Sequence, residues 1–184
     1  QSNDSAMSYP SDVLSPPTSP HSRKKRRAIL AAATEAFLGS GYGAATMDDI
    51  AGRAQVSKQT IYHHFGSKEM LFAAMIEERC EHFLAPIAQV ETGSGSLTDA
   101  LRRLGVDFLE RVLTPESLAL HRLVVAESAR FPELGQLTYE SGAKRIVARL
   151  AAFLSAHDGR DGLSFADPAL AAEQFFGALL GFLQ

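Results

Sequence analysis

The sequence predicts an all-α fold, and three observations support this prediction. From residue 22 onward, apolar residues recur at the three- and four-residue spacing that places them on one face of a helix. No segment shows the alternation of apolar and polar residues that is typical of a strand. Pro115, Pro132 and Pro168 each stand where the first turn of a helix tolerates proline. Because 46% of the 184 residues are hydrophobic, the chain can bury a substantial core.

The first 22 residues differ in composition from the rest of the chain. They hold four prolines and many serines but no lysine or arginine. Such a composition predicts a disordered tail over residues 1–22. Gln1 is not a natural start, so we expect the stretch before Met7 to be an expression scar.

Three short helices are predicted next. Ser22 is the expected N-cap of the first, and the glycine-rich residues 39–43 are expected to end it. Thr46 is expected to cap the second helix, and Ser57, after a tight turn, to cap the third, which runs to about His64. The segment 46–68 therefore has the length, the helix caps and the intervening turn of a helix-turn-helix. The third helix carries side chains that can donate hydrogen bonds to phosphates or base edges: Lys58, Gln59, Thr60, Tyr62, His63 and His64.

The rest of the chain also predicts helices. Ser67 is expected to cap a long fourth helix that ends at Pro86, followed by a flexible loop at 92–96. Further helices are expected at about 97–113, 115–130, 132–156 and 167–184, with a loop at 157–164. The last helix stops without a cap, so we expect the natural chain to continue beyond Gln184.

Charge and composition narrow the function classes. Residues 23–68 hold eight basic and three acidic residues, a net charge of +5, whereas the remainder carries −8. A basic end on an acidic body suggests contact with a polyanion. Cys80 is the only cysteine, which excludes an intramolecular disulfide. No apolar run reaches membrane-spanning length. We therefore expect a cytoplasmic protein without a membrane partner. We find no phosphate-binding loop, nucleophile elbow or paired metal-ligand motif, and so expect no enzyme, cofactor or metal.

The N-terminal segment resembles the DNA-binding domain of the TetR/AcrR family of transcriptional regulators. The resemblance covers about residues 23–72 and is carried by these residues: Arg27-Ala28-Ile29-Leu30, Ala33, Ala36-Phe37, Gly41-Tyr42, Thr46-Met47, Ile50-Ala51, Ala54-Gln55-Val56-Ser57-Lys58, Ile61-Tyr62-His63-His64-Phe65, Lys68-Glu69 and Leu71. It departs at Gln55, where glycine is common in the family. Residues 115–134 and 171–177 are similar to the C-terminal domain of the AefR-like branch.

The resemblance implies a homodimer that places one recognition helix per subunit in successive major grooves of operator DNA. The candidate DNA contacts are Thr46, Ser57, Lys58, Gln59, Thr60, Tyr62, His63, Lys68, Arg23, Lys24 and Arg26. Of these, Thr46, Tyr62 and Lys68 match positions that hold phosphates in relatives. The basic run 23–27 is interpreted as an arm along the DNA or, alternatively, as a solvated helix start.

The resemblance also implies a domain over residues 69–184 for ligand binding and dimerisation, after a DNA-binding domain over 23–68. Candidate pocket residues are Phe83, Phe108, His121, Arg122, Phe131 and Tyr139, which favour a small apolar effector, itself unidentified. Candidate dimer residues are Phe176, Gly177, Leu180 and Gly181, although the glycine spacing also suits packing within one chain. Repression is the family's usual mode, while activation stays open. The alternative function is a protein-interaction module that retains a helix-turn-helix.

Overall fold

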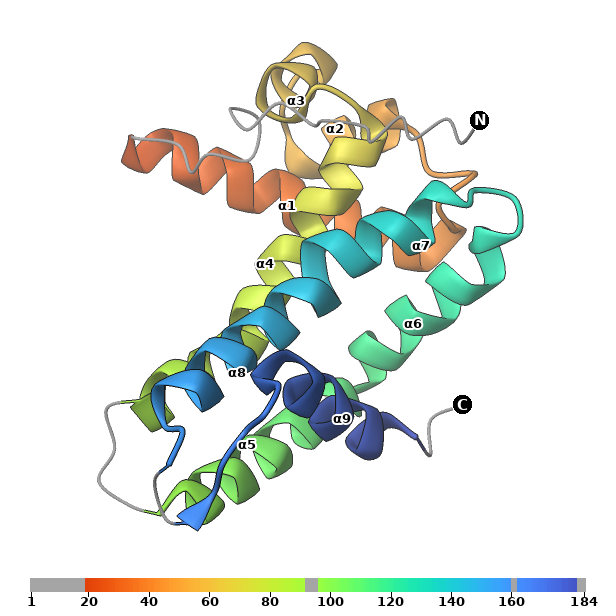
Figure 1. Cartoon of the computed structure of the whole chain (residues 1–184). Helices are drawn as coiled ribbons and strands as arrows, with labels where there is room; N and C mark the ends of the chain where they lie inside the picture. Colours follow the sequence, from red (N-terminus) through yellow and green to blue (C-terminus); the bar gives the residue numbers. More distant parts are fainter. Residues whose placement is uncertain (1–18, 92–95, 160–161, 182–184) are drawn as a thin grey trace, which may run out of the picture. The chain divides into compact units, whose positions relative to one another are not determined.

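The computed structural model describes residues 19–91, 96–159 and 162–181, drawn in colour in Figure 1. Within these ranges the chain is mostly helical and holds no strand, so the all-α prediction is confirmed. Contacts between residues divide the chain into two compact units, one up to Met75 and one from Ile76. The long helix α4 (Lys68–Glu91) begins in the first unit and continues into the second.

The first helix, α1 (Pro20–Ser40), begins earlier than the sequence predicted. The Ser19 side chain accepts a hydrogen bond from the Ser22 N–H at 3.1 Å, and Pro20 occupies the first turn. The predicted cap at Ser22 was therefore wrong, and residues 20–22 of the expected tail are helical. Residues 1–18 of that tail lie outside the described residues. At the other end, the helix stops at Gly41, whose φ of 85° favours glycine.

The predicted caps of the next three helices are confirmed. Thr46 caps α2 (Met47–Ala54) and Ser57 caps α3 (Lys58–Phe65), each side-chain oxygen accepting a backbone N–H at 3.1 Å. Ser67 accepts from the Met70 N–H at 3.2 Å at the start of α4. The predicted end of that helix at Pro86 was wrong, because the helix runs on to Glu91. Proline removes one backbone donor, but its φ is compatible with a helix.

An aromatic cluster forms part of the core of the first unit. The ring centroids of Phe37, Tyr42 and Phe72 lie 5.4–5.6 Å apart, in tilted and edge-to-face arrangements that aromatic rings favour. Ile50 of α2 and Ile61 of α3 are fully buried. Burial of one apolar face on each short helix fixes the side of α3 that stays exposed.

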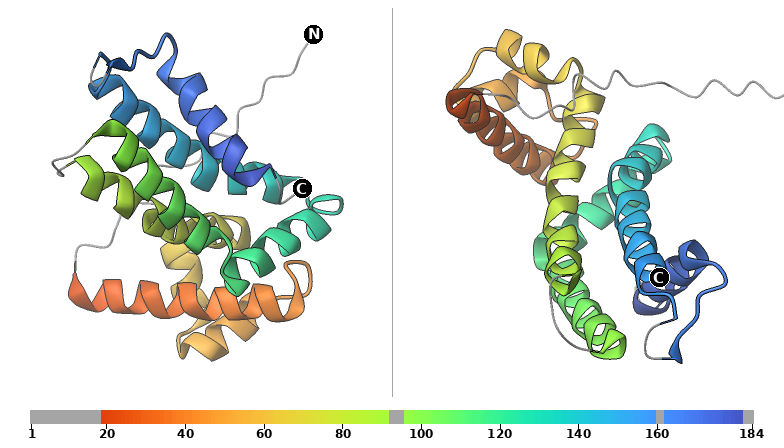
Figure 2. Two further views of the ribbon diagram at one scale, coloured as in Figure 1. Left: turned by 90° about the horizontal axis from the view of Figure 1, so that it is seen from below. Right: turned by 60° about the vertical axis from the view of Figure 1, so that its left-hand side comes forward.

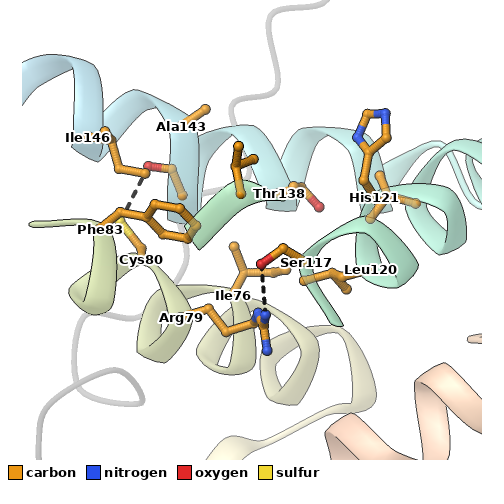
Figure 3. A pocket seen from close by; sticks show the side chains of 13 residues that line it. Ile76, Arg79, Cys80, Phe83, Ser117, Leu120, His121, Thr138, Ala143 and Ile146 are labelled. Atoms are coloured by element: carbon orange, nitrogen blue, oxygen red, sulfur yellow. Dashed lines mark hydrogen bonds between the residues drawn. The ribbon is translucent and has the colours of Figure 1, made fainter. Parts of the chain in front are cut away.

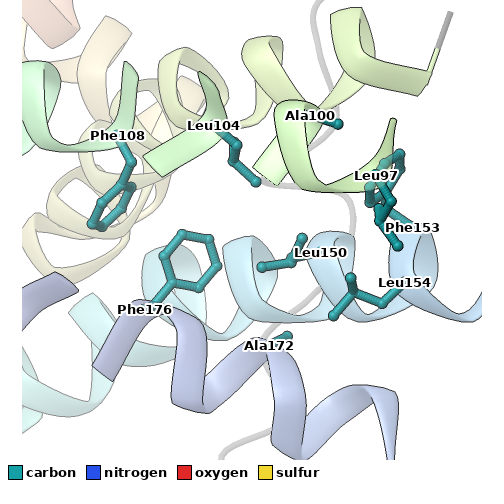
Figure 4. Packing of buried hydrophobic residues seen from close by; sticks show 9 residues of the cluster. All are labelled: Leu97, Ala100, Leu104, Phe108, Leu150, Phe153, Leu154, Ala172 and Phe176. Atoms are coloured by element: carbon teal, nitrogen blue, oxygen red, sulfur yellow. The ribbon is translucent and has the colours of Figure 1, made fainter. Parts of the chain in front are cut away.

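The second unit is built from α5 (Leu97–Val112), α6 (Pro115–Ser128), α7 (Glu133–Thr138), α8 (Lys144–Ala156) and α9 (Pro168–Leu180). Its core joins α5, α8 and α9 (Figure 4), through Leu97, Ala100, Leu104, Phe108, Leu150, Phe153, Leu154, Ala172 and Phe176. Figure 2 shows α8 and α9 packed against each other at the end of this unit. The loop expected at 92–96 falls almost wholly outside the described residues.

A π-helical turn, η1 (Tyr139–Ala143), interrupts the single helix predicted over 132–156. Figure 1 shows that α7, this turn and α8 still form one continuous rod. Within the turn, Gly142 comes close to α4, because a Cβ added there would lie 3.1 Å from Cγ2 of Ile76. The Cys80 thiol donates to the Gly142 carbonyl at 3.5 Å. Such turns are frequent at functional sites.

Candidate functional site

The segment from Thr46 to Lys68 forms a helix-turn-helix. Its helices α2 and α3 have eight residues each and are joined by residues 55–57. Gln55 has a left-handed backbone with φ of 55°, and its N–H donates to the Gly52 carbonyl at 3.3 Å. The left-handed residue closes α2 and turns the chain toward α3, as a helix C-cap does.

Helix α3 has one buried face and one exposed face. Ile61 and Phe65 have no exposed surface and anchor the helix. The exposed face carries four side chains that can donate hydrogen bonds: Lys58, Gln59, Tyr62 and His63. Tyr62 is 44% exposed although its ring is large and mainly apolar. Its hydroxyl is therefore presented to the surroundings by a helix whose orientation is fixed from behind.

Lys58, the first residue of α3, is paired with Asp48 of α2. Its Nζ donates to Asp48 Oδ2 at 2.8 Å, and this hydrogen bond raises the pKa of the lysine above its usual value. Both side chains are largely exposed, so the ion pair contributes little to stability. The pair instead holds the ammonium group of Lys58 beside the carboxylate of Asp48.

The hydroxyl groups predicted to contact DNA form hydrogen bonds within the protein. Thr46 Oγ1 and Ser57 Oγ are the caps of α2 and α3, and Ser57 Oγ also lies 2.8 Å from Thr60 Oγ1. Thr46 and Ser57 therefore each satisfy a backbone donor at the start of a helix.

The basic run at residues 23–27 belongs to α1 and does not form an extended arm. Of its two open interpretations, the structure shows a helix start. Arg23 and Lys24 are exposed on that helix. The Arg26 guanidinium lies 4.9 Å from the centre of the Phe65 ring of α3, a cation–π contact that ties α1 to the recognition segment.

Lys68 packs on the first unit's aromatic cluster. Its Nζ lies 4.5 Å from the centre of the Tyr42 ring, whose hydroxyl lies 3.3 Å from Glu69 Oε1. Burial opposes ionisation of Glu69, but hydrogen bonds from Ser67, from its own backbone and from Tyr42, together with Lys68, hold its pKa below the usual value. Lys68 is half-buried at the start of α4.

A cavity of about 190 Å³ lies in the second unit (Figure 3). Its walls come from α4, α6 and the rod of α7, η1 and α8, with one residue from α5. The lining residues are Ile76, Arg79, Cys80, Phe83, Val112, Ser117, Leu120, His121, Val124, Thr138, Gly142, Ala143 and Ile146. Most of this surface is apolar, which is typical of a site for a small organic ligand.

Two neighbouring residues of α4, Arg79 and Cys80, contribute polar groups to the cavity wall, and α6 holds the first of them in place. Arg79 Nη1 donates to Glu116 Oε1 at 2.5 Å, and its Nη2 donates to Ser117 Oγ at 3.2 Å. Cys80, one residue further along α4, is buried, and burial raises the pKa of its thiol to about 11. The thiol is therefore neutral near pH 7.

Comparison with known proteins identifies the family. Residues 29–75 match bacterial regulatory proteins of the tetR family, and residues 99–184 match the C-terminal domain of AefR-like transcriptional repressors. A solved TetR-family transcriptional regulator from Mesorhizobium loti MAFF303099, itself described as putative, is 32% identical, with a TM-score of 0.74. That alignment covers 89% of this chain and 83% of the other. The chain belongs to the TetR family.

Two further regulators are similar. The solved structure of the flavonoid-responsive regulator FrrA is 38% identical, with a TM-score of 0.69, over 87% of this chain and 81% of the other. The HTH-type transcriptional regulator TcmR of Streptomyces glaucescens is 30% identical over 146 residues, 76% of this chain and 62% of TcmR. The chain spans less than two thirds of the length of the curated relatives it matches. TetR-family proteins are DNA-binding transcriptional regulators, generally ligand-responsive repressors, and form a non-enzymatic family.

The cavity of the second unit contains two of the six pocket residues predicted from sequence, Phe83 and His121. Phe108 instead belongs to the hydrophobic core, where its ring centre lies 4.8 Å from that of Phe176. The other three are not among the lining residues: Arg122 and Tyr139 are exposed, and Phe131 lies beneath the Arg130 guanidinium. None of these four residues lines this cavity, because helical periodicity does not say which neighbour a face will meet.

Sequence reasoning missed Arg79, Ser117 and Thr138 in the cavity wall. One signal was available, since Arg79 lies between Ile76 and Phe83 on an otherwise apolar face of its helix. A charged residue in such a position requires a partner, and Glu116 supplies it.

The predicted dimer residues occupy different environments. Phe176 is buried in the core of its own unit, so its prediction as a partner contact was wrong. Gly177 and Gly181 are exposed on α9, and a Cβ added to Gly177 would meet no atom within 4 Å. Leu180 is half-buried and packs against the same core. The glycines therefore leave an open surface on α9.

The described residues hold neither a membrane-spanning helix nor a cluster of metal-ligating side chains. None of the helices there is long and apolar enough to cross a membrane. Within the same ranges, no three His, Cys, Asp or Glu side chains are grouped so that they could hold a metal ion.

Proposed function

We propose that this chain is a ligand-responsive transcriptional repressor that binds a palindromic operator as a homodimer. The observation that carries the proposal is the recognition helix α3, anchored by Ile61 and Phe65 and exposing Lys58, Gln59 and Tyr62. A short helix fixed from behind, with donors on its free face and N-terminus, fits a DNA major groove. We place DNA binding in residues 23–68 and ligand binding and dimerisation in 69–184.

The exposed positions suggest separate roles. Lys58, Gln59 and His63 are assigned to base edges and flanking phosphates, since lysine commonly reads guanine and glutamine commonly reads adenine. Tyr62 and Thr46 are assigned to phosphates, which set the position of the helix without reading sequence.

A second group of candidates is assigned to supporting phosphate contacts. Arg23 and Lys24 project from the first turns of α1, and Ser57 and Thr60 lie at the N-terminus of α3. Arg26 and Lys68 pack on aromatic rings, so we expect them to position helices as much as to contact DNA. Their removal should weaken binding for every sequence alike.

Dimerisation is assigned to the exposed surface of α8 and α9, where Gly177 and Gly181 permit close approach of a second helix. A two-fold dimer would place its recognition helices about 34–36 Å apart, one turn of DNA, or a multiple of that distance. The operator is then expected to be a palindrome.

Effector binding is assigned to the cavity of the second unit. α4 contributes Ile76, Arg79, Cys80 and Phe83 to that cavity and begins at Lys68, three residues after the recognition helix ends. A ligand that favours one position of α4 can therefore change DNA affinity, by as much as its own affinity differs between the two positions, typically about 1–3 kcal/mol. The relative FrrA is described as flavonoid-responsive, which supports a small organic effector with an apolar ring here.

The proposal is tested by selecting sequences from a random double-stranded DNA library at two salt concentrations. We expect enrichment of a palindrome and a steep fall in affinity as salt rises, because each phosphate contact releases counterions. A folded dimer that enriches no sequence at either salt concentration would favour the protein-interaction alternative.

Tyr62→Phe supplies a direct test of the recognition surface. Loss of the hydroxyl should weaken operator binding about tenfold or more, as expected for a hydrogen bond to a charged group, and should leave the melting temperature unchanged. Tyr139→Phe, at a tyrosine 54% exposed in the second unit, is the matched control and should bind as wild type does. Equal operator affinity of Tyr62→Phe and wild type would remove Tyr62 from the contact surface.

A further inference from the structure

The cavity of the second unit has an asymmetric set of polar groups. None of its thirteen described lining residues is acidic, while Arg79 contributes a permanent positive charge. Ser117, Thr138 and His121 add side chains that can donate hydrogen bonds. The walls therefore offer hydrogen-bond donors to a ligand, and no acidic lining residue among those described repels a negatively charged ligand.

The Arg79 guanidinium retains capacity for a ligand. Glu116 and Ser117 take two N–H donors, and a guanidinium has five. Figure 3 shows the Arg79 and Ser117 side chains meeting at one wall of the cavity, with Thr138 across from them and Phe83 toward the other end. A ligand can thus place a polar group by Arg79 and an apolar body by Phe83.

The present partner of Arg79 is replaceable. The Glu116 side chain is 54% exposed, whereas that of Arg79 is 21% exposed. Glu116 can turn into water at little cost, since ion pairs with an exposed partner are weak. A ligand carboxylate in the largely apolar cavity would meet the same guanidinium at lower effective dielectric and could accept two parallel hydrogen bonds.

Cys80 does not counter this preference for an anion. Its thiol is a donor to Gly142, and burial raises its pKa to about 11, so it carries no negative charge near neutral pH. Cys80 therefore adds no negative charge to the cavity wall that would compete with a ligand anion for Arg79.

We propose that the effector is a small amphiphilic carboxylic acid whose carboxylate binds Arg79 and Ser117 and whose apolar body packs against Phe83 and Ile146. The proposal rests on the proposed function in taking this cavity as the effector site. Beyond that function, the proposal specifies the charge and the size of the ligand.

The size follows from the cavity volume of about 190 Å³. An apolar cavity of about 150 Å³ holds a benzene molecule. The volume here therefore suits one ring with a short side chain, or an aliphatic chain of similar bulk. Polycyclic compounds and long acyl chains would have to enlarge it.

The test compares acids with their uncharged analogues. Binding to the full chain is measured by calorimetry for benzoate, phenylacetate, 3-phenylpropanoate and octanoate, each beside its primary amide. We expect at least one acid to bind about tenfold or more tightly than its amide, because hydrogen bonds between charged partners are the strong ones. Equal binding within every pair, or no binding by any acid, would overturn the proposal.

Variants separate a ligand contact from a structural ion pair. Arg79→Gln should abolish the preference for acid over amide. Glu116→Gln should raise acid affinity severalfold, because it removes the competing carboxylate. Arg102→Gln, which breaks an exposed pair with Asp99 elsewhere in the unit, is the control and should change neither. A purely structural Arg79 would make Arg79→Gln and Glu116→Gln behave alike, and that result would refute the assignment.

Release of operator DNA distinguishes the two proposals. If an amide releases DNA as well as its acid does, the regulatory function stands and the carboxylate proposal fails. If an acid binds with the expected preference in wild type and loses it in Arg79→Gln, yet does not change DNA affinity, the carboxylate site stands and the regulatory function fails.

Discussion

The two units of the chain present their candidate functional residues differently. In the first unit, Lys58, Gln59 and Tyr62 lie on the exposed face of one eight-residue helix. In the second, the residues around the cavity come from positions 76–83, 112–124 and 138–146. The proposed DNA-binding surface is therefore a local structure, whereas the cavity is formed by segments far apart in the sequence.

The two units therefore depend on different contacts for the shape of their candidate sites. The face that α3 exposes follows from two buried anchors and one cap, all within nine residues of each other. The cavity depends on the approach of α4 to η1, where Gly142 allows close contact with Ile76. A small change in helix packing would thus reshape the cavity while leaving the recognition helix intact.

The largest expected effect comes from removing a core ring. Phe37→Ala should destabilise the first unit by about 3–5 kcal/mol, because it leaves a cavity within the aromatic cluster. Operator binding should fall with it. Chemical denaturation and DNA titration measure both effects. A loss of stability below about 1 kcal/mol would show that the cluster does not hold this unit together.

Phe108→Ala is the matched change in the second unit. It removes a buried ring 5.6 Å from the centre of Phe83, which lines the cavity. We expect a comparable loss of stability together with tighter binding of acids larger than 3-phenylpropanoate. If calorimetry shows that Phe108→Ala and wild type accept acids of the same size, the core ring does not limit the cavity. That result would weaken the comparison between the two units.

Asp48→Asn probes the ion pair that holds Lys58. Removing the carboxylate frees the lysine for a phosphate and removes a repulsive charge, so operator affinity should rise about two- to fivefold. The slope of log affinity against log salt should steepen by roughly one per subunit. Asp99→Asn breaks a similar exposed pair in the second unit and should change neither quantity. A fall in affinity for Asp48→Asn would mean that the pair positions Lys58 for DNA.

Gln55→Gly tests the turn of the first unit. Gln55 has a positive φ, which costs a residue with a Cβ about 1 kcal/mol relative to glycine. The substitution should therefore stabilise the protein by up to about 1 kcal/mol, or roughly 2–4 °C in melting temperature. Gln136→Gly, within α7, should have the opposite sign because glycine weakens a helix interior. Destabilisation by both would show that the Gln55 side chain makes a needed contact.

The smallest expected effect is a pH dependence from His64. Burial lowers its pKa, and His63, Arg26 and Lys25 lower it further. A histidine with a depressed folded pKa binds its proton more readily when unfolded, so the protein should lose stability as pH falls below about 6.5. His64→Gln should melt with a shallower dependence between pH 7.5 and 5.5, and His63→Gln should flatten it less, because His63 is a smaller cause of the His64 shift than burial. An identical pH dependence of melting for wild type and His64→Gln would mean that other groups cause the loss of stability.

The local features of the fold were predictable from sequence. Caps such as Thr46 and Ser57 are signalled by residue type and by the apolar residues that follow them, and the structure confirms both. The π turn at 139–143 was not predictable, because its residues resemble those of an ordinary helix and the turn depends on contact with α4.

The candidate sites divide in the same way. The exposed residues of α3 could be named from one helical repeat and a family resemblance. The cavity required knowing which helices meet, so Phe108 was mistaken for a lining residue and Arg79 was overlooked. Phe176 was similarly assigned to a partner, although its own core buries it.

The most direct test of the account measures operator affinity and acid affinity for wild type, Tyr62→Phe and Arg79→Gln in one set of titrations. Tyr62→Phe should weaken operator binding and leave acid binding unchanged. Arg79→Gln should keep operator binding in the absence of ligand and lose release by the acid. If Arg79→Gln abolishes operator binding, or Tyr62→Phe leaves it intact, the division of DNA recognition and ligand sensing between the two units is contradicted.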